Sequence, residues 1–414
     1  MKRGTECKTH TFTPIIATPL SVWSLIASLY TTQYLGLSFF SVALVAILRK
    51  QGASLEQISS VYVLGMIGAC KFLWSPIVDK FRFTPKIGHF RGWLLLMQSL
   101  LVVLLCFISS LDVATNFSMV YLLCIFMAIC GATQDIATDG LVCSLLTEKE
   151  RGIGNGIQTA GGMFGFMIGA GLVLMAYPSV GWQVAVLILA AGTAVSWVQL
   201  LFFKEPEFHI QPYQGWQAVS RLFSFWRQPN ILKWLAMLFL FPMGITIAYS
   251  LLTPALVDNQ WSLERIGFVV DVLGPIMGIL SSLLTGWMIS RFGRNKMTYY
   301  CIVMQFLSVV SVLFVAWGYT SEPVVVMAVL AHFLGYVPSV TMLSTLMMDR
   351  VSQKSPATDY TVQFSVYQFI AMGVGGLGMT LAGRMGYEGA IYIALGGVIL
   401  GAITAINYVA KQDN

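Results

Sequence analysis

Five ionisable residues lie within long apolar stretches of the sequence, where a charge is costly unless it is paired or hydrated. They are Lys71, Asp135, Asp139, Asp271 and His332. Asp135 and Asp139 are four residues apart, so a helix places both carboxyl groups on one face. Because two carboxylates beside one cation cannot all ionise cheaply, this spacing predicts a proton-binding site.

Lys71 and Asp135 lie at similar depths in their apolar stretches, so an ion pair between them is geometrically feasible. In one interpretation, the carboxylate that Lys71 does not compensate binds a proton, and Lys71 serves as its alternate partner. In the other, Lys71 and Asp135 only lock two helices together, as buried ion pairs often do. His332 is alone on an apolar segment, which is typical either of a satisfied core residue or of a site residue.

The composition indicates that lipid is the solvent of this chain. Of 414 residues, 57% are hydrophobic and 10% are charged, whereas soluble domains average roughly 25% charged residues. The net charge of +6 comes from short basic clusters between apolar runs, which indicates membrane orientation and argues against a nucleic-acid partner. Seven cysteines without C-x-x-C spacing and four histidines without ligand spacing predict neither disulfides nor a metal site.

Twelve apolar stretches are long enough to cross a bilayer as helices, which needs about 20 residues. Backbone groups in lipid must be satisfied within the segment, and the alternation typical of a membrane barrel is absent. The sequence therefore predicts an all-α membrane protein with twelve transmembrane helices. The stretches run approximately over 20–47, 56–78, 93–110, 118–141, 153–176, 182–203, 231–256, 266–289, 298–317, 323–347, 360–382 and 389–410.

The distribution of basic residues predicts the orientation of these helices. With both termini in the cytoplasm, the inner segments hold 19 of the 24 Lys and Arg residues and the outer segments hold 4. The basic, polar N-terminus lacks a cleavage signal and is expected to be a retained tail. We expect a cytoplasmic tail at 1–19, a six-helix bundle at 20–203, a cytoplasmic linker at 204–230, a second bundle at 231–410 and a cytoplasmic tail at 411–414.

The linker contains a short amphipathic pattern. Five apolar residues near one helical face predict a helix lying on the inner membrane surface, and the alternative is a solvated linker with a few aromatic residues. They are Trp216, Val219, Leu222, Phe223 and Trp226.

The two halves repeat some features, which indicates two pseudo-symmetric bundles. SPIVDKF (Ser75 to Phe81) ends the second span, and GWMISRFGRNK (Gly286 to Lys296) ends the eighth. Gly161, Gly165 and Gly169 recur at four-residue spacing in the fifth span, and the eleventh is also glycine-rich. Small residues at this spacing let helix backbones approach closely in lipid.

These segments resemble a known family. GWMISRFGRNK is similar to the loop signature of the major facilitator superfamily, with Ser290 in place of its acidic residue, and Asp79 keeps that acid in the first half. CKFLWSPIVD, GATQDIATDGL and EKERGIGNGIQ resemble the subgroup of muropeptide permeases, acetyl-CoA transporters and siderophore permeases. The opening span, from Ser28 to Ile58, resembles siderophore permeases of the rhizobactin and pyochelin type.

The resemblance implies a monomeric secondary active transporter of the bacterial inner membrane. It is expected to import an intact ferric siderophore by alternating access, to bind no nucleic acid and to use no cofactor. Proton coupling through Asp135, Asp139 and Lys71 is expected. The alternatives are a muropeptide or other bulky-solute permease of the same subgroup, and a drug or siderophore exporter. A membrane-embedded transferase is a distant alternative, because the sequence shows neither a nucleophile paired with a base nor a metal-binding cluster. We therefore do not expect an enzyme. The sequence also lacks a Walker motif, so we do not expect it to hydrolyse ATP.

The resemblance also implies gating and substrate-binding residues. Asp79 is expected to gate the cytoplasmic side together with Arg291 and Arg294. Phenol and amide groups among aromatic residues suit a large, polar, partly aromatic ligand, although aromatic residues at such spacing more often serve packing than a site. The expected cavity residues are Tyr30, Gln33, Tyr34, Phe40, Gln134, Gln158, Tyr249, His332, Tyr336, Gln363 and Tyr367.

Overall fold

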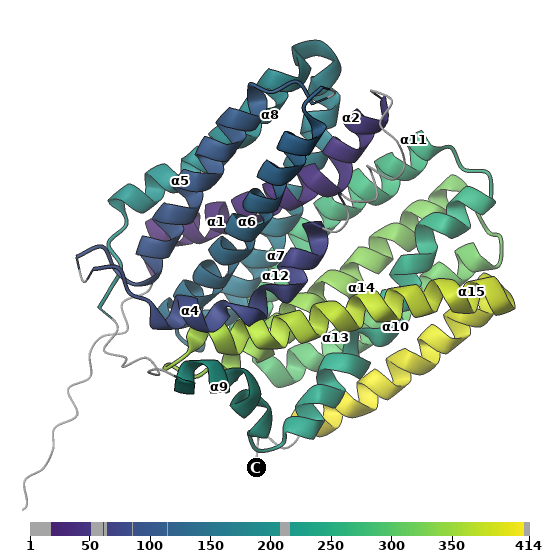
Figure 1. Cartoon of the computed structure of the whole chain (residues 1–414). Coiled ribbons are helices and arrows are strands. Elements are labelled where there is room, and N and C mark those ends of the chain that lie inside the picture. The colour runs from purple at the N-terminus through teal and green to yellow at the C-terminus, as the bar shows by residue number, and fades with distance from the viewer. Residues whose placement is uncertain are drawn as a thin grey trace, which may run out of the picture.

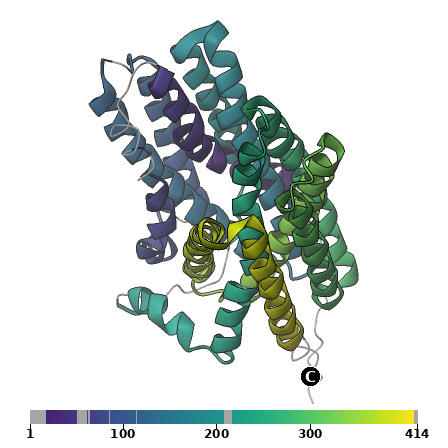
Figure 2. The same ribbon diagram turned by 90° about the vertical axis from the view of Figure 1, so that its right-hand side faces the viewer.

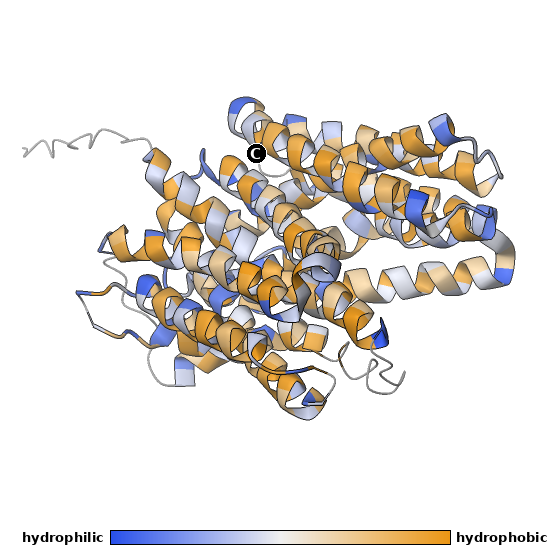
Figure 3. Cartoon of the chain, turned by 90° about the horizontal axis from the view of Figure 1, so that it is seen from above, coloured by the Kyte–Doolittle hydropathy of each residue, from blue (hydrophilic) through white to orange (hydrophobic). Residues whose placement is uncertain are grey.

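The computed structural model describes residues 18–50, 61, 64–84, 86–113, 115–207 and 216–409. Within these ranges the chain is built from helices joined by short connections. Apolar residues run along the helices, and hydrophilic residues gather at their ends (Figure 3). This distribution fits helices that face lipid along their length and water at both ends.

The first half begins with α1 (Leu20–Ser38), which continues through a π-helix (Phe39–Leu44) into α2 (Val45–Lys50). A short helix (Leu64–Leu73) leads to α4 (Ser75–Lys80). The remaining helices are α5 (Phe90–Ser109), α6 (Phe117–Leu145), α7 (Arg151–Phe166), a π-helix (Met167–Leu172) and α8 (Val173–Phe202).

The second half follows a short helix, α9 (Trp216–Ser224), and one 3-10 turn (Phe225–Arg227). Its helices are α10 (Ile231–Asp258), α11 (Leu263–Ile266), a π-helix (Gly267–Leu273), α12 (Gly274–Phe292), α13 (Arg294–Ala316), α14 (Glu322–Asp349) and α15 (Pro356–Val409).

The described residues contain nine helical segments that are long and apolar enough to cross a membrane. Two of them, Arg151–Phe202 and Pro356–Val409, have 52 and 54 residues. At 1.5 Å per residue each is more than twice as long as a bilayer core is thick, so each contains two spans. With the short helix before α4, the expected twelve-helix membrane fold is confirmed.

Two glycines mark the points where the double-length helices turn back. Gly181 has φ 73° and Gly386 has φ 77°, in the left-handed region that favours glycine. These turns lie in the short connections that the sequence predicts between the fifth and sixth spans and between the eleventh and twelfth. An alanine at either position would be strained, because its Cβ makes this backbone conformation unfavourable.

The helices gather in two groups, one from each half of the chain (Figures 1 and 2). Close helix contacts within the first group depend on the glycines of α7. A Cβ on Gly165 would lie 2.2 Å from the backbone oxygen of Thr31 in α1, and one on Gly161 would lie 3.1 Å from the oxygen of Ala27. The four-residue glycine spacing therefore forms a close α1–α7 contact.

The buried apolar residues form several clusters, and one of them draws on both halves. It includes Tyr30 and Val142 from the first half and Trp234, Ile289 and Tyr360 from the second. Its members include residues at the ends of α6 and α14 and at the start of α15, and α4 packs against α15 at this end of the molecule (Figure 1). We call this the closed end, because the two halves are in direct contact there.

Several expected segments fall partly outside the described residues. The N-terminal tail before Thr18, the linker residues 208–215 and the C-terminal residues 410–414 are not described, and neither is the side chain of Phe40. The linker helix α9 is described, with Ala218 buried and Trp216 and Phe223 exposed. It lies beside α4 and the start of α15 (Figure 1).

Candidate functional site

A cavity of about 460 Å³ lies between the two halves. Its size falls within the range of roughly 300–1,000 Å³ that is usual for ligand sites. The walls come from α1, α7, α10, α12, α14 and α15 and from the π-helix that contains Asp271. The lining includes Tyr34, Gln158, Met163, Tyr249, Asp271, Tyr336, Phe364, Tyr367 and Gln368.

Stacked rings form one wall of this cavity. The ring centroids of Tyr249 and Tyr336 are 5.4 Å apart with an interplanar angle of 12°. His332 stacks on both rings, and its Nδ1 lies 3.0 Å from the hydroxyl of Ser308. His332 is fully buried behind the wall, so it holds the two tyrosines in place while they face the cavity.

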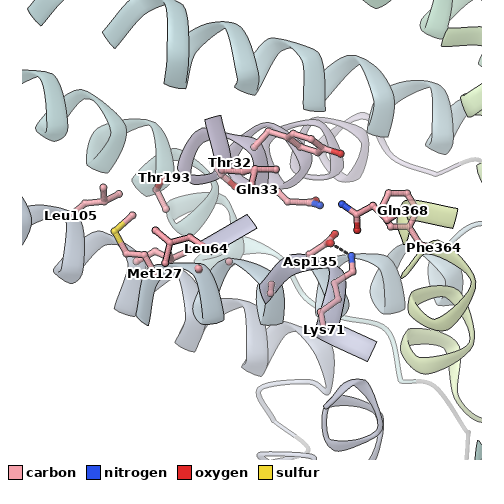
Figure 4. A pocket seen from close by; sticks show the side chains of 18 residues that line it. Thr32, Gln33, Leu64, Lys71, Leu105, Met127, Asp135, Thr193, Phe364 and Gln368 are labelled. Atoms are coloured by element: carbon pink, nitrogen blue, oxygen red, sulfur yellow. Dashed lines mark hydrogen bonds and ion pairs between the residues drawn. The ribbon is translucent and has the colours of Figure 1, made fainter. Parts of the chain in front are cut away.

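Lys71 and Asp135 form a buried ion pair in the first half, in which the ammonium Nζ contacts Oδ2 of Asp135 (Figure 4). The residues are 1% and 7% exposed. The ammonium also lies 4.8 Å from the ring centroid of Phe364 in α15, at a distance that allows a cation–π contact. Lys71 therefore interacts with residues of both halves.

Asp139 lies one helical turn from Asp135 and has neutral hydrogen-bond donors. The hydroxyl of Tyr30 donates to its Oδ1 over 2.9 Å, and the Gln158 amide donates to the same oxygen over 3.1 Å. The hydroxyl of Tyr360 in α15 in turn donates to Oε1 of Gln158 over 3.1 Å. Gln158 thus links this carboxyl group to the second half of the chain.

A smaller pocket of about 90 Å³ adjoins the central cavity. Tyr34, Phe364 and Gln368 line both spaces, so the two are neighbours. Lys71 and Asp135 also line the smaller one, which we call the side pocket. In Figure 4, Gln33 from α1 and Gln368 from α15 point toward the ion pair from opposite sides.

At the closed end, Asp79 of α4 binds the first turn of α15. The backbone N–H of Ala357 donates to Oδ1 over 3.1 Å, and that of Thr358 donates to Oδ2 over 2.7 Å. A carboxylate at a helix N-terminus is stabilised by unpaired N–H groups and by the helix dipole. These bonds join the two halves of the chain.

An ion-pair network makes a second connection at this end. Asp349 of α14 accepts hydrogen bonds from Arg151 of the first half over 2.9 Å and from Arg294 over 2.9 and 3.0 Å. Arg294 also donates to the backbone oxygen of Glu148 over 2.7 Å. Arg291, by contrast, is exposed and forms no ion pair within the described part of the chain.

Two carboxylates outside the spans fasten the loops at the closed end. Burial opposes the ionisation of Glu150, but hydrogen bonds from Thr147 and Thr18 hold the pKa of this carboxyl below its usual value. Burial raises the pKa of Glu205, although the backbone N–H of Arg91 donates to it over 2.7 Å. Glu205 thereby ties the start of α5 to the end of α8.

Six of the expected substrate-binding residues line one of the two spaces. They are Gln33, Tyr34, Gln158, Tyr249, Tyr336 and Tyr367. Four others line neither of the two spaces. Each of them forms hydrogen bonds within the protein. The partner of Tyr30 is Asp139, that of Gln134 is Thr32 and that of His332 is Ser308. The Gln363 amide donates to the backbone oxygens of Met347 and Asp359. Each is buried among helices, where a polar group needs a protein partner.

Several contacts escaped the sequence reasoning. Phe364 lies on the face of α15 that also carries Tyr360, Tyr367 and Gln368, so helical periodicity could have selected it instead of Gln363. No pattern in the sequence around Asp349 predicts its ion pairs with Arg151 and Arg294. Among the described residues, no group of three His, Cys, Asp or Glu side chains is arranged to hold a metal ion.

Comparisons with known proteins place the chain among membrane permeases. It is 31% identical over 262 residues to the anhydromuropeptide permease of Escherichia coli (strain K12), a match that covers 62% of this chain and 53% of that protein. The chain thus spans about half the length of this curated relative. This relative is named for muropeptides, so the match does not confirm the expected siderophore branch.

Two solved structures share the fold. The human organic anion transporter MFSD10 (TETRAN) has a TM-score of 0.71 and 15% identity, covering 94% of this chain and 100% of that one. The transporter FucP in the outward conformation has a TM-score of 0.68 and 14% identity, covering 93% and 97%. The model of the Major Facilitator Superfamily matches residues 26–376. The chain therefore belongs to the Major Facilitator Superfamily.

Proposed function

We propose that this protein is a secondary transporter of the bacterial inner membrane that imports a muropeptide-class solute by alternating access. The observation that carries the proposal is the cavity of about 460 Å³ between the two halves, whose lining contains both tyrosines and polar side chains. A muropeptide joins an amino sugar to a short peptide, so it presents both ring faces and polar groups. Aromatic faces pack well against sugar rings, and amides suit the peptide.

The similarity to an anhydromuropeptide permease supports this substrate class over a siderophore. The charge asymmetry supports a cytoplasmic location for both termini and for the closed end. In that orientation the described conformation is closed toward the cytoplasm, and the cavity serves the outer side. We assign 20–203 and 231–410 to two bundles that rock against each other, and 204–230 to the linker between them.

Asp79 is the proposed gate residue, because its hydrogen bonds to α15 exist only while the halves are in contact. Arg294 contributes through Asp349 and Glu148, and Arg291 contributes only to the local positive charge. Opening toward the cytoplasm must break these contacts.

Asp139 is the proposed proton-coupling residue. Asp135 has a cationic partner in Lys71, whereas the direct hydrogen bonds to Asp139 come from the neutral donors Tyr30 and Gln158. A buried carboxyl group without a direct cation is the cheaper of the two to protonate. Lys71 interacts electrostatically with Asp139 as well, so it can serve as the alternate partner when Asp135 is neutral.

Uptake of labelled solutes tests the proposal. Cells that lack their own muropeptide permease should accumulate labelled anhydromuropeptide when they express this protein. Tyr336→Ala, in the cavity wall, should lower uptake by about fivefold, because one aromatic contact contributes about 1 kcal/mol. Tyr299→Ala is the matched control, since Tyr299 is 49% exposed on α13. Uptake of a ferric siderophore, with none of the muropeptide, would return the assignment to the siderophore branch.

A further inference from the structure

The side pocket is a separate space with its own polar groups. Its volume of about 90 Å³ is much smaller than the 460 Å³ of the central cavity, so it suits a small group at the end of a ligand better than a whole sugar ring. It shares Tyr34, Phe364 and Gln368 with the central cavity. A ligand in the central cavity can therefore extend one small group into it.

The donors around the side pocket suit an anion. The ammonium of Lys71 has three N–H groups, and Asp135 is its ion-pair partner. The amide nitrogens of Gln33 and Gln368 face each other across the pocket beside this ammonium (Figure 4). Two neutral donors and one cation are a suitable set for the two oxygens of a carboxylate.

The same groups are incompletely satisfied as they stand. Oδ1 of Asp135, Oε1 of Gln33 and Oε1 of Gln368 are buried without a hydrogen-bond partner among the described residues. Each such atom costs about 1–3 kcal/mol. The carboxylate end of a peptide carries an amide N–H next to its charge, so it brings a donor for these acceptors together with an acceptor for Lys71.

We propose that the side pocket binds the free carboxylate end of a short peptide, with Lys71 as the charged contact and Gln33 and Gln368 as the neutral ones. This inference rests on the proposed function, because it names the part of a muropeptide-class solute that enters the pocket. Gln33 belongs to the first half and Gln368 to the second, so a bound carboxylate contacts both halves of the transporter.

The charges around the pocket constrain how a carboxylate is admitted. Asp135 and Asp139 are the acids that interact with Lys71, and a ligand carboxylate adds a third negative charge beside one cation. A buried excess of negative charge is costly. The carboxylate therefore enters together with the proton that we assign to Asp139, which ties ligand binding to proton uptake at one cluster.

A matched pair of small probes tests the pocket without any muropeptide. N-acetyl-alanyl-alanine and its C-terminal amide differ only in the carboxylate. The full-length protein in lipid nanodiscs is heated with each probe, and the affinity is obtained from the rise in its unfolding temperature with probe concentration. Because a hydrogen bond to a charged group contributes about 1.5–3 kcal/mol, the acid should bind about tenfold or more tightly than the amide.

Three variants locate the effect. Lys71→Met combined with Asp135→Asn removes both charges of the ion pair, and the acid and amide should then bind equally. Asp135→Asn alone keeps Lys71 and should keep the preference for the acid. Glu388→Gln is the control, because Glu388 is exposed and lines neither space, and it should leave the preference unchanged.

The outcomes separate the two proposals. If the unaltered protein binds the acid and the amide equally well, the side-pocket assignment is overturned, independently of the results for the variants. A preference that survives the double substitution overturns it as well. A clear preference for the acid in a protein that does not take up muropeptide supports the pocket and refutes the proposed substrate. Muropeptide uptake without any preference refutes the pocket alone.

Discussion

Arg221 of α9 binds Asp359 of α15 with both prongs of its guanidinium, because the Nε–Oδ1 and Nη2–Oδ2 distances are each 2.7 Å. Asp359 is fully buried and also accepts hydrogen bonds from Ser352 and Ser355. Thr358, the preceding residue, donates its N–H to Asp79. The linker helix is thus fastened to the same turn of α15 that joins the two halves.

The first prediction concerns this fastening. Arg221→Gln leaves Asp359 without its cation and loosens the turn that Asp79 binds, so the closed end should open more often. Opening is measured in a variant that lacks the native cysteines and carries Ser344→Cys. Ser344 lines the cavity, so the rate at which a maleimide added on the cytoplasmic side labels this thiol reports how often the closed end opens. Because breaking a partly buried ion pair costs several kcal/mol, labelling should be at least tenfold faster than in the parent.

Arg227→Gln is the control for this experiment. Arg227 is exposed in the 3-10 turn directly after α9, so its loss removes the same charge from the same segment without touching α15. Its labelling rate should equal that of the parent. Equal rates for Arg221→Gln and Arg227→Gln would show that α9 does not hold the closed end.

The second prediction concerns Asp79. Asp79→Asn keeps one acceptor oxygen but loses the negative charge at the start of α15. Hydrogen bonds to a charged group contribute about 1.5–3 kcal/mol, so the closed end should open about tenfold more readily. The same Ser344→Cys labelling measures it, with Glu207→Gln, exposed in the linker, as control. An unchanged labelling rate would remove Asp79 from the gate.

The third prediction concerns the contact between α7 and α12. A Cβ on Gly286 would lie 2.6 Å from the backbone oxygen of Gly152, whereas a Cβ on Gly396 would meet nothing within 4 Å. Gly286→Ala should therefore strain only the conformation in which the halves touch. Overpacking costs about 1–3 kcal/mol, which shifts the population by about fivefold or more. Distances between spin labels at the closed end measure this shift, and Gly396→Ala should show none.

The fold follows from features that a sequence displays directly. Apolar stretches of sufficient length predict helices in lipid, and the turns at Gly181 and Gly386 fall where the pattern is interrupted. Depth along two spans was enough to suggest that Lys71 meets Asp135. These properties depend on composition and on distance along the chain, so no tertiary information is needed to derive them.

The candidate site was harder to predict, because the rotation of each helix about its own axis depends on the helices that pack against it. Gln363 and Phe364 are adjacent, yet Phe364 faces the cavity while the Gln363 amide donates to the backbone of Met347. Arg221 and Asp359 are 138 residues apart and carry no local signal of their contact. Polar residues on a span are equally suited to a cavity and to a buried partner, and only the packing decides between them.

The last prediction separates the roles of Asp135 and Asp139. Asp139→Asn mimics the protonated acid: its side-chain oxygen can still accept from Tyr30, and its charge is permanently removed. Asp135→Asn instead removes the ion-pair partner of Lys71 and leaves Asp139 free to take up a proton.

If Asp139 carries the coupled proton, Asp139→Asn should bind substrate and exchange it down its own gradient, but should lose uphill accumulation. Asp135→Asn should keep accumulation driven by a pH gradient, because Asp139, the proposed proton site, is unchanged. Membrane vesicles with an imposed pH gradient measure accumulation, and vesicles preloaded with unlabelled substrate measure exchange. The expected difference is in the ratio of internal to external substrate concentration, which should fall toward one only in Asp139→Asn. If both variants accumulate substrate normally and uptake ignores the pH gradient, the cluster holds the helices together and does not couple transport to protons.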